Sequence, residues 1–196
     1  TSEIGYSFPL YLFQEDGSRH PNLNKNLWEE INTVAGRTNP EDVLDYVYAV
    51  LYSPKYRSEY QEFLKINFPK IPYPTQKETF WKLVDLGKIL RQLHLFEKEA
   101  EDSGITFSEV GANVIEKGYP KYINRNVYIN EKQYFGGISE DVWNFRIGGY
   151  HPTKKWLKDR VSSKLKIEEI YHYQNIVAII SKTLETKKKI DIILNV

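Results

Sequence analysis

Five cationic side chains fall within fifteen residues of the chain, and their chemistry suits a phosphate backbone. They are Arg146, Lys154, Lys155, Lys158 and Arg160. Ammonium and guanidinium groups bind phosphate oxygens through charge-assisted hydrogen bonds. A helix whose basic face is only solvated would have the same composition, so the residues alone leave both interpretations open.

A second group of polar side chains lies in a segment rich in Tyr, Asn and Lys. Amide and cationic side chains on turns can reach base edges or phosphates. The candidates are Lys121, Asn124, Arg125, Asn126, Asn130, Lys132 and Gln133. We expect the interspersed rings of Tyr122, Tyr128 and Tyr134 to be cross-strand packing partners, as aromatic residues in sheets usually are.

No other site chemistry is recognisable. The chain has no Cys, which excludes disulfides and thiolate metal sites. The histidines share no metal-ligand spacing; they are His20, His94, His151 and His172. A phosphate-binding glycine loop and a nucleophile elbow are also missing, and the 26 acidic residues make chance pairs inevitable. The sequence therefore predicts no catalytic residue, no metal and no cofactor in this chain.

Charge is unevenly distributed along the chain although the net charge is only +1. Residues 1–116 carry 12 Lys and Arg against 18 Asp and Glu, whereas residues 117–166 carry 11 against 4. Residues 167–196 are balanced at 4 against 4. A basic segment beside an acidic one is the electrostatic pattern expected of a nucleic-acid surface supported by a scaffold.

Helix signals dominate the first half of the chain. Asn39-Pro40-Glu41-Asp42 combines a capping Asn, Pro at the first helical position and acids in the first turn, and Ser53-Pro54 repeats the start signal. Two further helices are predicted over residues 24–34 and 76–98. An alternating opening strand around residues 8–12 precedes them.

Beyond Ser103-Gly104 the pattern changes to short strands separated by Asn and Gly turns. The predicted strands cover residues 113–116, 119–123, 127–129, 133–135 and 142–147. The last of these rests on the alternation of Trp143, Phe145 and Ile147. Gly148-Gly149 then allows a sharp turn into a short basic helix that begins near Pro152.

Apolar spacing from Ile167 to Leu184 predicts an amphipathic closing helix. We therefore expect an α+β fold, with a helical N-terminal half packed against a small, mainly antiparallel sheet and closed by a C-terminal helix. Residues 1–196 are predicted to form one domain, with a helical scaffold over 1–112, a basic strand-rich part over 113–166 and the closing helix over 167–196. No apolar run approaches the length of a membrane span.

Several longer motifs resemble one protein family. They are Phe8–Phe13, Arg19–Leu23, Pro40–Arg57, Phe63–Pro72, Leu86–Leu95, Tyr128–Asn130 and Gln133–Phe135, and above all Phe145-Arg-Ile-Gly-Gly-Tyr150 with Lys155-Trp-Leu-Lys-Asp-Arg160. In this order they are similar to the C-terminal specificity domain of single-polypeptide Type ISP restriction enzymes and related adenine-specific DNA methyltransferases. The resemblance spans nearly the whole chain.

The resemblance implies a target-recognition domain excised from a larger cytoplasmic polypeptide. Its partners would be double-stranded DNA and the methyltransferase domain of the parent chain, which would bind S-adenosylmethionine, flip an adenine out of the duplex and methylate it. Cofactor, helicase and nuclease motifs of the family belong to those other domains. This chain would therefore be catalytically silent by itself.

The resemblance also divides the candidate residues into two roles. Members of such a family recognise different sites, so a shared motif suits folding or phosphate binding better than base discrimination. We expect backbone phosphates to be contacted by Arg146, Lys154, Lys155, Lys158 and Arg160, and bases to be read by Lys121, Asn124, Arg125, Asn126 and Lys132. Trp156 would be a buried anchor of the basic helix rather than a wedge in DNA.

An interaction module is the alternative that the sequence leaves open. The acidic helical half could exist mainly to dock on another domain of the parent enzyme, and the basic segment could then supply only non-specific DNA affinity. Basic residues that converge on one surface would favour recognition, whereas scattered ones would favour docking.

Overall fold

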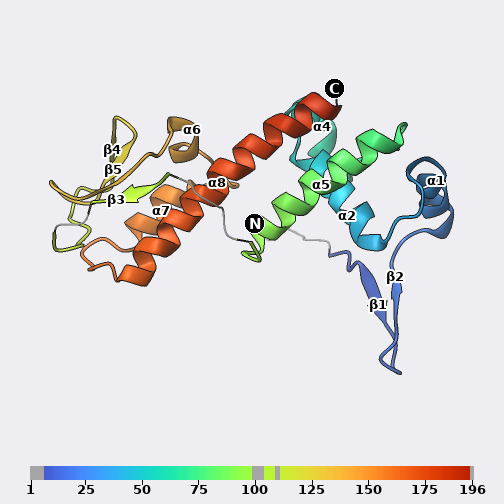
Figure 1. The fold of residues 1–196 in the computed structure, drawn as a ribbon, viewed down its shortest axis with the longest axis horizontal. Coiled ribbons are helices and arrows are strands. Elements are labelled where there is room, and N and C mark those ends of the chain that lie inside the picture. Colours follow the sequence, from blue (N-terminus) through green and yellow to red (C-terminus); the bar gives the residue numbers. More distant parts are fainter. Residues whose placement is uncertain (1–6, 99–103, 109–110, 195–196) are drawn as a thin grey trace. The chain divides into compact units, whose positions relative to one another are not determined.

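The computed structural model describes residues 7–98, 104–108 and 111–194 (Figure 1). The described residues form two compact units, one within Thr1–Gln92 and Thr186–Val196 and the other within Leu93–Glu185. We name them the helical unit and the sheet unit and describe each by itself. The prediction that residues 1–196 form one domain, with parts divided at 112 and 166, stays a prediction.

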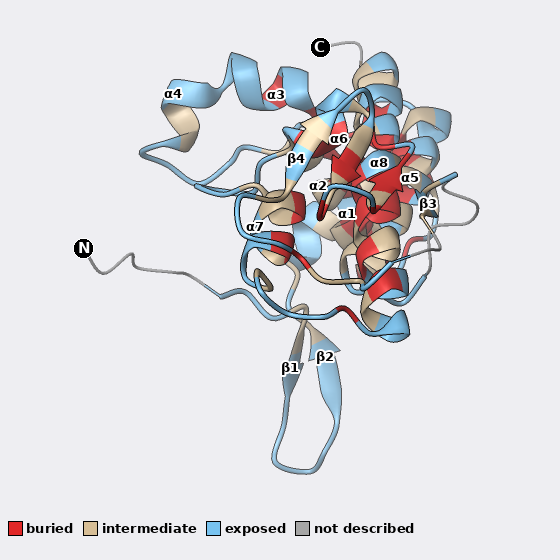
Figure 2. Ribbon diagram, turned by 90° about the vertical axis from the view of Figure 1, so that its left-hand side faces the viewer, coloured by how far each residue is buried: buried red, intermediate tan, exposed pale blue. Residues whose placement is uncertain are grey.

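The helical unit starts with an antiparallel hairpin of β1 (Tyr11–Phe13) and β2 (Arg19–Pro21), which is exposed over most of its length (Figure 2). The Tyr11 hydroxyl donates to the Glu41 carboxylate at 2.8 Å and ties the hairpin to the helices. Those helices are α1 (Lys25–Ala35), α2 (Pro40–Tyr52), α3 (Pro54–Glu59), α4 (Gln61–Leu64) and α5 (Lys77–His94).

Both predicted start signals are confirmed at atomic detail. Asn39 Oδ1 accepts from the Asp42 N–H and Asp42 Oδ2 accepts from the Asn39 N–H, each at 2.9 Å, which forms a reciprocal capping box. Ser53 Oγ accepts from the Tyr56 N–H at 3.0 Å at the start of α3. Local side-chain chemistry thus determines where α2 and α3 begin.

Helices α2 and α5 approach each other closely at Gly87, where a Cβ atom would collide with the carbonyl oxygen of Asp45. One turn later, Arg91 donates to both oxygens of the Asp45 carboxylate at 2.6 and 3.0 Å. Because the Asp45 side chain is only 3% exposed, this bidentate pair neutralises a charge that would otherwise be costly to bury.

The core of the helical unit is made mainly by α2 and α5, and the end of α8 (Ile167–Leu194) completes it. Ser53 Oγ donates to Asp191 Oδ1 at 2.6 Å and holds that end of α8 against the junction of α2 and α3. The buried side chains are Ala35, Tyr46, Ala49, Val50, Tyr56, Phe80, Leu83, Val84, Leu90 and Ile190.

The sheet unit contains a four-stranded antiparallel sheet in the order β3-β6-β5-β4. Its strands are β3 (Thr106–Phe107), β4 (Lys121–Ile123), β5 (Asn126–Tyr128) and β6 (Tyr134–Gly136). The predicted strands over 119–123, 127–129 and 133–135 are therefore confirmed approximately. Residues 113–116 contribute only an isolated bridge between Val114 and Lys164, and β3 was not predicted.

The predicted strand over residues 142–147 is wrong. A short helix, α6 (Glu140–Trp143), occupies its start, and Ser139 Oγ caps that helix by accepting from the Val142 N–H. Ser139 followed by two acidic residues is a helix start signal that outweighs the apparent alternation downstream. Beyond α6, Ile147 and Tyr150 form one isolated bridge around Gly148, whose φ of +56° confirms the predicted turn.

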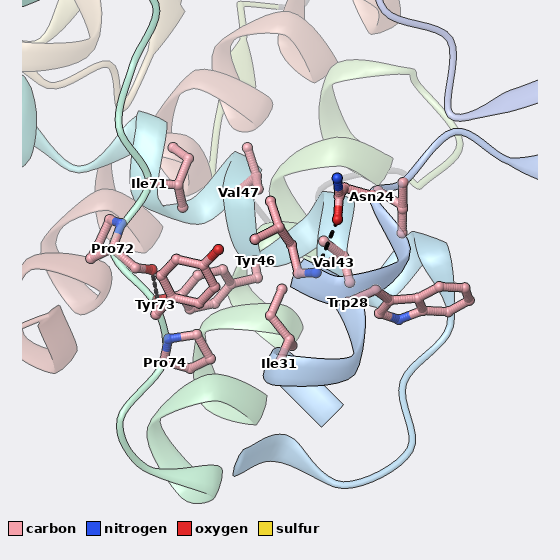
Figure 3. A pocket seen from close by; sticks show the side chains of 12 residues that line it. Asn24, Trp28, Ile31, Val43, Tyr46, Val47, Ile71, Pro72, Tyr73 and Pro74 are labelled. Carbon is pink, nitrogen blue, oxygen red and sulfur yellow. Dashed lines mark hydrogen bonds between the residues drawn. The ribbon is translucent and has the colours of Figure 1, made fainter. Parts of the chain in front are cut away.

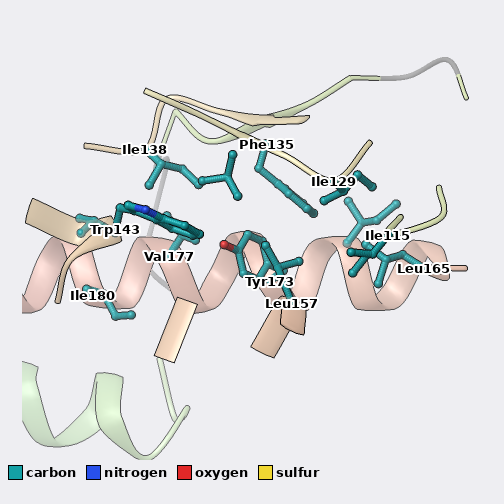
Figure 4. Close-up of a cluster of buried hydrophobic side chains, with 13 residues drawn as sticks. Ile115, Ile129, Phe135, Ile138, Trp143, Leu157, Leu165, Tyr173, Val177 and Ile180 are labelled. Carbon is teal, nitrogen blue, oxygen red and sulfur yellow. The ribbon is translucent and has the colours of Figure 1, made fainter. Parts of the chain in front are cut away.

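Helix α7 (Pro152–Lys158) is the predicted basic helix, and α8 is the predicted closing helix. Trp156 packs with its ring centroid 5.2 Å from that of Tyr173, so it contacts the core as predicted, but it is half-buried and not the fully buried anchor that was expected. In the core, Phe135 of the sheet packs on the same Tyr173 ring, with the two ring centroids 4.4 Å apart (Figure 4). The remaining core residues come from the sheet, α6, α7, α8 and the segments that connect them, and include Ile115, Val127, Ile129, Ile138, Trp143, Leu157, Leu165 and Val177.

These elements confirm the predicted α+β fold class. Within the described ranges, no helix combines the length and apolar character needed to cross a membrane. The same residues contain no group of three or more His, Cys, Asp or Glu side chains that could hold a metal ion.

Candidate nucleic-acid interface

The turn between β4 and β5 presents two of the predicted base-reading residues. Asn124 and Arg125 are both exposed, and their φ angles of +49° and +65° lie in the left-handed region. Ile123 pairs with Asn126 across this two-residue turn, which has the φ pattern of a type I′ hairpin. The Arg125 carbonyl accepts from the Ile138 N–H at 2.9 Å, so the backbone of the turn is held in place while its side chains remain exposed.

The other predicted base-reading residues are placed less uniformly. Lys121 is exposed on β4, with Nζ 4.5 Å from the centroid of the Tyr119 ring. Lys132 is exposed in the loop between β5 and β6. Asn126 is half-buried, and its Oδ1 lies close to Gly136: a Cβ atom added to Gly136 would be 3.3 Å from this oxygen. The side chain of Asn126 therefore lies against the neighbouring strand.

Two residues that the sequence suggested as base readers are instead structural. Gln133 is fully buried and Asn130 is 7% exposed. Gln133 Oε1 accepts from the Asn113 N–H at 2.7 Å and from Asn130 Nδ2 at 3.2 Å, while Asn130 Oδ1 accepts from the Gln133 N–H at 2.7 Å. Their amides satisfy backbone groups of a tight loop, so they cannot reach a base.

The prediction that the tyrosines pack across strands is confirmed for Tyr128 and Tyr134, whereas the ring of Tyr122 packs on α6. Tyr128 and Tyr134 face each other across β5 and β6 with ring centroids 5.0 Å apart. Tyr122 stacks on Trp143 at 5.7 Å and donates its hydroxyl to the Ile138 carbonyl at 3.1 Å. These rings support the sheet and its hairpin.

Three of the predicted phosphate-binding cations lie close together. Lys154 Nζ donates to Asn144 Oδ1 at 2.9 Å and lies 5.0 Å from the centroid of the Trp143 ring. Partial burial, followed by the nearby charges of Lys158 and Arg146, lowers the pKa of Lys154. Like charges held near one another are relieved by an anion, so this cation trio, Arg146, Lys154 and Lys158, is suited to bind a phosphate.

Trp143 connects the cation trio to the β4–β5 hairpin. Tyr122 of β4 stacks on this ring and Lys154 of α7 contacts it. The roles of Trp143 and Asn144 were missed because both residues were assigned to a strand. The capping pattern at Ser139 is the signal that could have placed Trp143 on a helix instead.

Lys155 and Arg160, the other two predicted phosphate contacts, already have partners. Lys155 Nζ forms an ion pair with Asp159 at 2.7 Å. Arg160 Nε donates to Glu169 at 3.1 Å, and its guanidinium lies 3.7 Å from the centroid of the Trp156 ring. Arg160 therefore braces α7 against α8.

The uneven charge along the chain does not become a charge difference between the two units. The sequence of the helical unit holds 14 Lys and Arg against 13 Asp and Glu, and that of the sheet unit holds 13 against 13. Any attraction for a polyanion must therefore come from local clusters such as the cation trio.

The helical unit contains an apolar groove of about 230 Å³ between α1, α2 and the extended segment that precedes α5 (Figure 3). Trp28, Tyr46 and Pro72 are among the residues that line it, and the Tyr46 hydroxyl donates to the Pro72 carbonyl at 2.9 Å. This groove was not predicted from the sequence.

Comparison with known families identifies the chain. Residues 1–191 match the family described as the Type ISP C-terminal specificity domain. The chain belongs to this family. Its resemblance to Type ISP specificity domains in the sequence motifs is thereby confirmed, while no curated protein sequence is similar enough to match.

Solved structures share the fold of this specificity domain. In a DrdV–DNA complex, 96% of the domain matches with a TM-score of 0.66 at 18% identity. The ATP-dependent Type ISP restriction-modification enzyme LlaBIII bound to DNA matches over 92% with a TM-score of 0.62 at 21% identity, and a nuclease-deletion mutant of LlaGI with a DNA substrate mimic matches over 80% with a TM-score of 0.55 at 23% identity. The domain covers 21%, 13% and 14% of these chains, respectively.

Proposed function

We propose that this specificity domain recognises a site in duplex DNA for a larger restriction-modification polypeptide. The observation that carries the proposal is the arrangement around Trp143, where the β4–β5 hairpin meets the cation trio. A two-stranded β-ribbon fits the major groove, in which every base pair presents a distinct pattern of donors and acceptors.

In this proposal the two contact types have different tasks. Arg146, Lys154 and Lys158 bind backbone phosphates and fix the register of the domain on the duplex. Arg125 and Asn124 at the turn, together with Lys121, reach base edges. The other predicted contacts have only supporting roles in this proposal. Asn126 lies against the neighbouring strand and Lys132 lies outside the β4–β5 turn. Lys155 is paired with Asp159, and Arg160 is paired with Glu169.

The proposed parent is a cytoplasmic, S-adenosylmethionine-dependent methyltransferase that modifies the exocyclic nitrogen of adenine. The specificity domain would position the target for its methyltransferase domain. S-adenosylmethionine would bind to that methyltransferase domain. The domain would supply recognition and no catalytic group.

Binding to a random-sequence duplex pool across a salt series, with sequencing of the retained fraction, tests the proposal. We expect one enriched asymmetric motif and an affinity that falls steeply as salt rises, because bound cations release counterions from the duplex. Retention of duplexes without an enriched motif would contradict the proposal that the isolated domain recognises its site by itself.

Docking within the parent enzyme is the second candidate, and the apolar groove of the helical unit favours it. If the pool gives no enriched motif, the isolated domain and its parent methyltransferase domain should be mixed and analysed by titration calorimetry. Loss of their association on Trp28→Ala, together with an unenriched pool, would assign docking as the main task.

A further inference from the structure

A short exposed loop follows α6 and lies, in the sequence, between two members of the cation trio. Its ends are joined by two backbone hydrogen bonds, from the Ile147 N–H to the Tyr150 carbonyl at 3.0 Å and from the Tyr150 N–H to the Ile147 carbonyl at 3.3 Å. Gly148 and Gly149 form the turn between them, and the φ of +56° at Gly148 is what a two-residue hairpin turn requires at its first central position. We name residues 147–150 the glycine tip.

The glycine tip exposes both its backbone and its apolar side chains. Open space surrounds the positions at which Cβ atoms of Gly148 and Gly149 would lie. Ile147 is 52% exposed and Tyr150 is 49% exposed, although both side chains are large and mainly apolar. Phe145, two residues earlier, instead packs against the core of the sheet unit. The side chains of the tip are therefore accessible to a ligand.

The base of the glycine tip is anchored beside the cations. His151 Nδ1 donates to the carbonyl oxygens of Asn144 and Phe145, each 3.1 Å away. Lys154 Nζ donates to the Asn144 side chain at 2.9 Å, and Arg146 directly precedes the tip. An apolar tip is thus held between two members of the cation trio.

This combination of groups fits the minor groove of duplex DNA. That groove is about 6 Å wide, so a narrow turn without side chains at its apex can enter it. Proteins that bind there insert apolar side chains such as Ile between base steps, while cations bind the phosphates. A single exposed apolar side chain needs no ligand to explain it. An apolar pair between clustered cations, however, is complementary to a groove that is lined by phosphates.

We propose that the glycine tip enters the minor groove of the bound duplex and wedges Ile147 between two base pairs, while Arg146 and Lys154 bind the phosphates beside it. The inference rests on the proposed DNA-binding function and adds an uncharged contact to it. Because a wedge unstacks a base step, it responds to the deformability of the DNA rather than to base edges. Flexible steps such as TA and CA would be preferred where the wedge enters.

Fluorescence of 2-aminopurine tests the wedge directly, because this adenine analogue brightens when its base step is unstacked. The analogue replaces each adenine in turn in a duplex retained from the random pool, and the intact chain is added to saturation. We expect a rise at one or more positions with the wild type, no rise with Ile147→Ala, and a full rise with Ile147→Leu, which keeps the apolar volume. A rise that persists in Ile147→Ala, or no rise with the wild type, would overturn the inference.

Salt dependence separates the wedge from the neighbouring cations. Ile147→Ala should weaken duplex binding about tenfold because it removes an apolar contact. It should leave the salt slope unchanged, because an uncharged side chain releases no counterions, whereas Arg146→Gln should lower the slope by about one unit. The matched control is Ile167→Ala, at another exposed isoleucine of the sheet unit, which should bind as the wild type does. A reduced slope in Ile147→Ala would overturn the wedge, since the tip would then act only by positioning cations.

The two proposals fail in different ways. An enriched motif without any rise in 2-aminopurine fluorescence would refute the wedge and leave target recognition intact. A rise that Ile147→Ala abolishes, on retained duplexes that share no enriched motif, would support the wedge and refute recognition by the isolated domain. A domain that binds no duplex at all would refute both.

Discussion

Arg125 occupies a backbone conformation that suits Gly better than Arg. At φ of +65° the Cβ atom crowds the backbone, which costs about 1 kcal/mol for a residue with a side chain. Such strain persists where the side chain has a task that the fold itself does not need. We infer that Arg125 is kept for an external contact.

This inference predicts opposite effects of Arg125→Gly on stability and recognition. The free energy of unfolding should rise by about 1 kcal/mol as the turn relaxes. Affinity for the enriched motif should fall by about 1–3 kcal/mol, and affinity for other sequences should change little. Denaturant unfolding and competition binding measure the two quantities. A variant that is less stable, or that keeps its sequence preference, would show that Arg125 is not a base reader.

His94 should make the stability of the sheet unit depend on pH. Burial lowers the pKa of His94 below its ordinary value of 6.5, and its Nε2 lies 3.0 Å from Thr183 Oγ1. The folded state therefore favours neutral His94, and its contribution is complete above the unfolded pKa. As pH falls below about 6.5, the unfolded chain takes up a proton that the folded chain resists, so stability decreases.

Urea unfolding at about pH 7.5 and pH 5.5 checks this sign. The wild type should lose stability on acidification, and His94→Gln should lose less because it removes the titrating group. An equal loss in both proteins would assign the pH dependence to other residues.

At the scale of one helix, α7 presents its lysines in two different states. Lys155 is paired with Asp159 one turn away, whereas Lys158 belongs to the cation trio. A lysine that is paired with a carboxylate gives up part of that ion pair when it contacts a phosphate, so it gains less from DNA than a lysine that is repelled by its neighbours. The spacing of the lysines does not distinguish these states, since both are exposed residues of the same helix.

Lys158→Ala should therefore lower the salt slope of DNA binding by about one unit, and Lys155→Ala should lower it by less. Both substitutions keep the helix, because Ala is a strong helix former. Binding to one duplex at several salt concentrations gives the slopes. A larger effect from Lys155→Ala would place the phosphate on the Asp159 side of α7.

At the scale of the whole molecule, the two units have separate cores, and Gly87 belongs to only one of them. A methyl group at Gly87 would collide with the Asp45 backbone and disturb the buried pair with Arg91. We expect Gly87→Ala to destabilise the helical unit by about 3 kcal/mol.

Hydrogen exchange resolves where that loss occurs. Amides of the helical unit such as Val50 should lose protection in Gly87→Ala, while that of Phe135 in the sheet unit should keep most of it, because each lies in its own core. The matched control is Gly149→Ala, since a Cβ at Gly149 meets no atom within 4 Å. Equal loss at Val50 and Phe135 would mean that the two cores unfold together.

Local chemistry determined much of this fold from the sequence alone. Asn39 and Ser53 cap their helices as predicted, because a cap needs only its own side chain and the next turn of backbone. The β4–β5 hairpin and α7 were also predictable, and family motifs spread along the chain were sufficient to indicate the specificity domain.

Only the tertiary structure decided which polar residues are available to a ligand. Asn130 and Gln133, like Asn124 and Arg125, are polar residues of the same Asn- and Tyr-rich segment. In the structure Asn130 and Gln133 are buried and hold a loop, whereas Asn124 and Arg125 are exposed. The cation trio joins Arg146, which precedes α7, to Lys154 and Lys158 of α7. The exposure of a side chain and its distance to other charges depend on contacts between segments that are far apart in the sequence. The spacing of residues along the chain does not reveal those contacts.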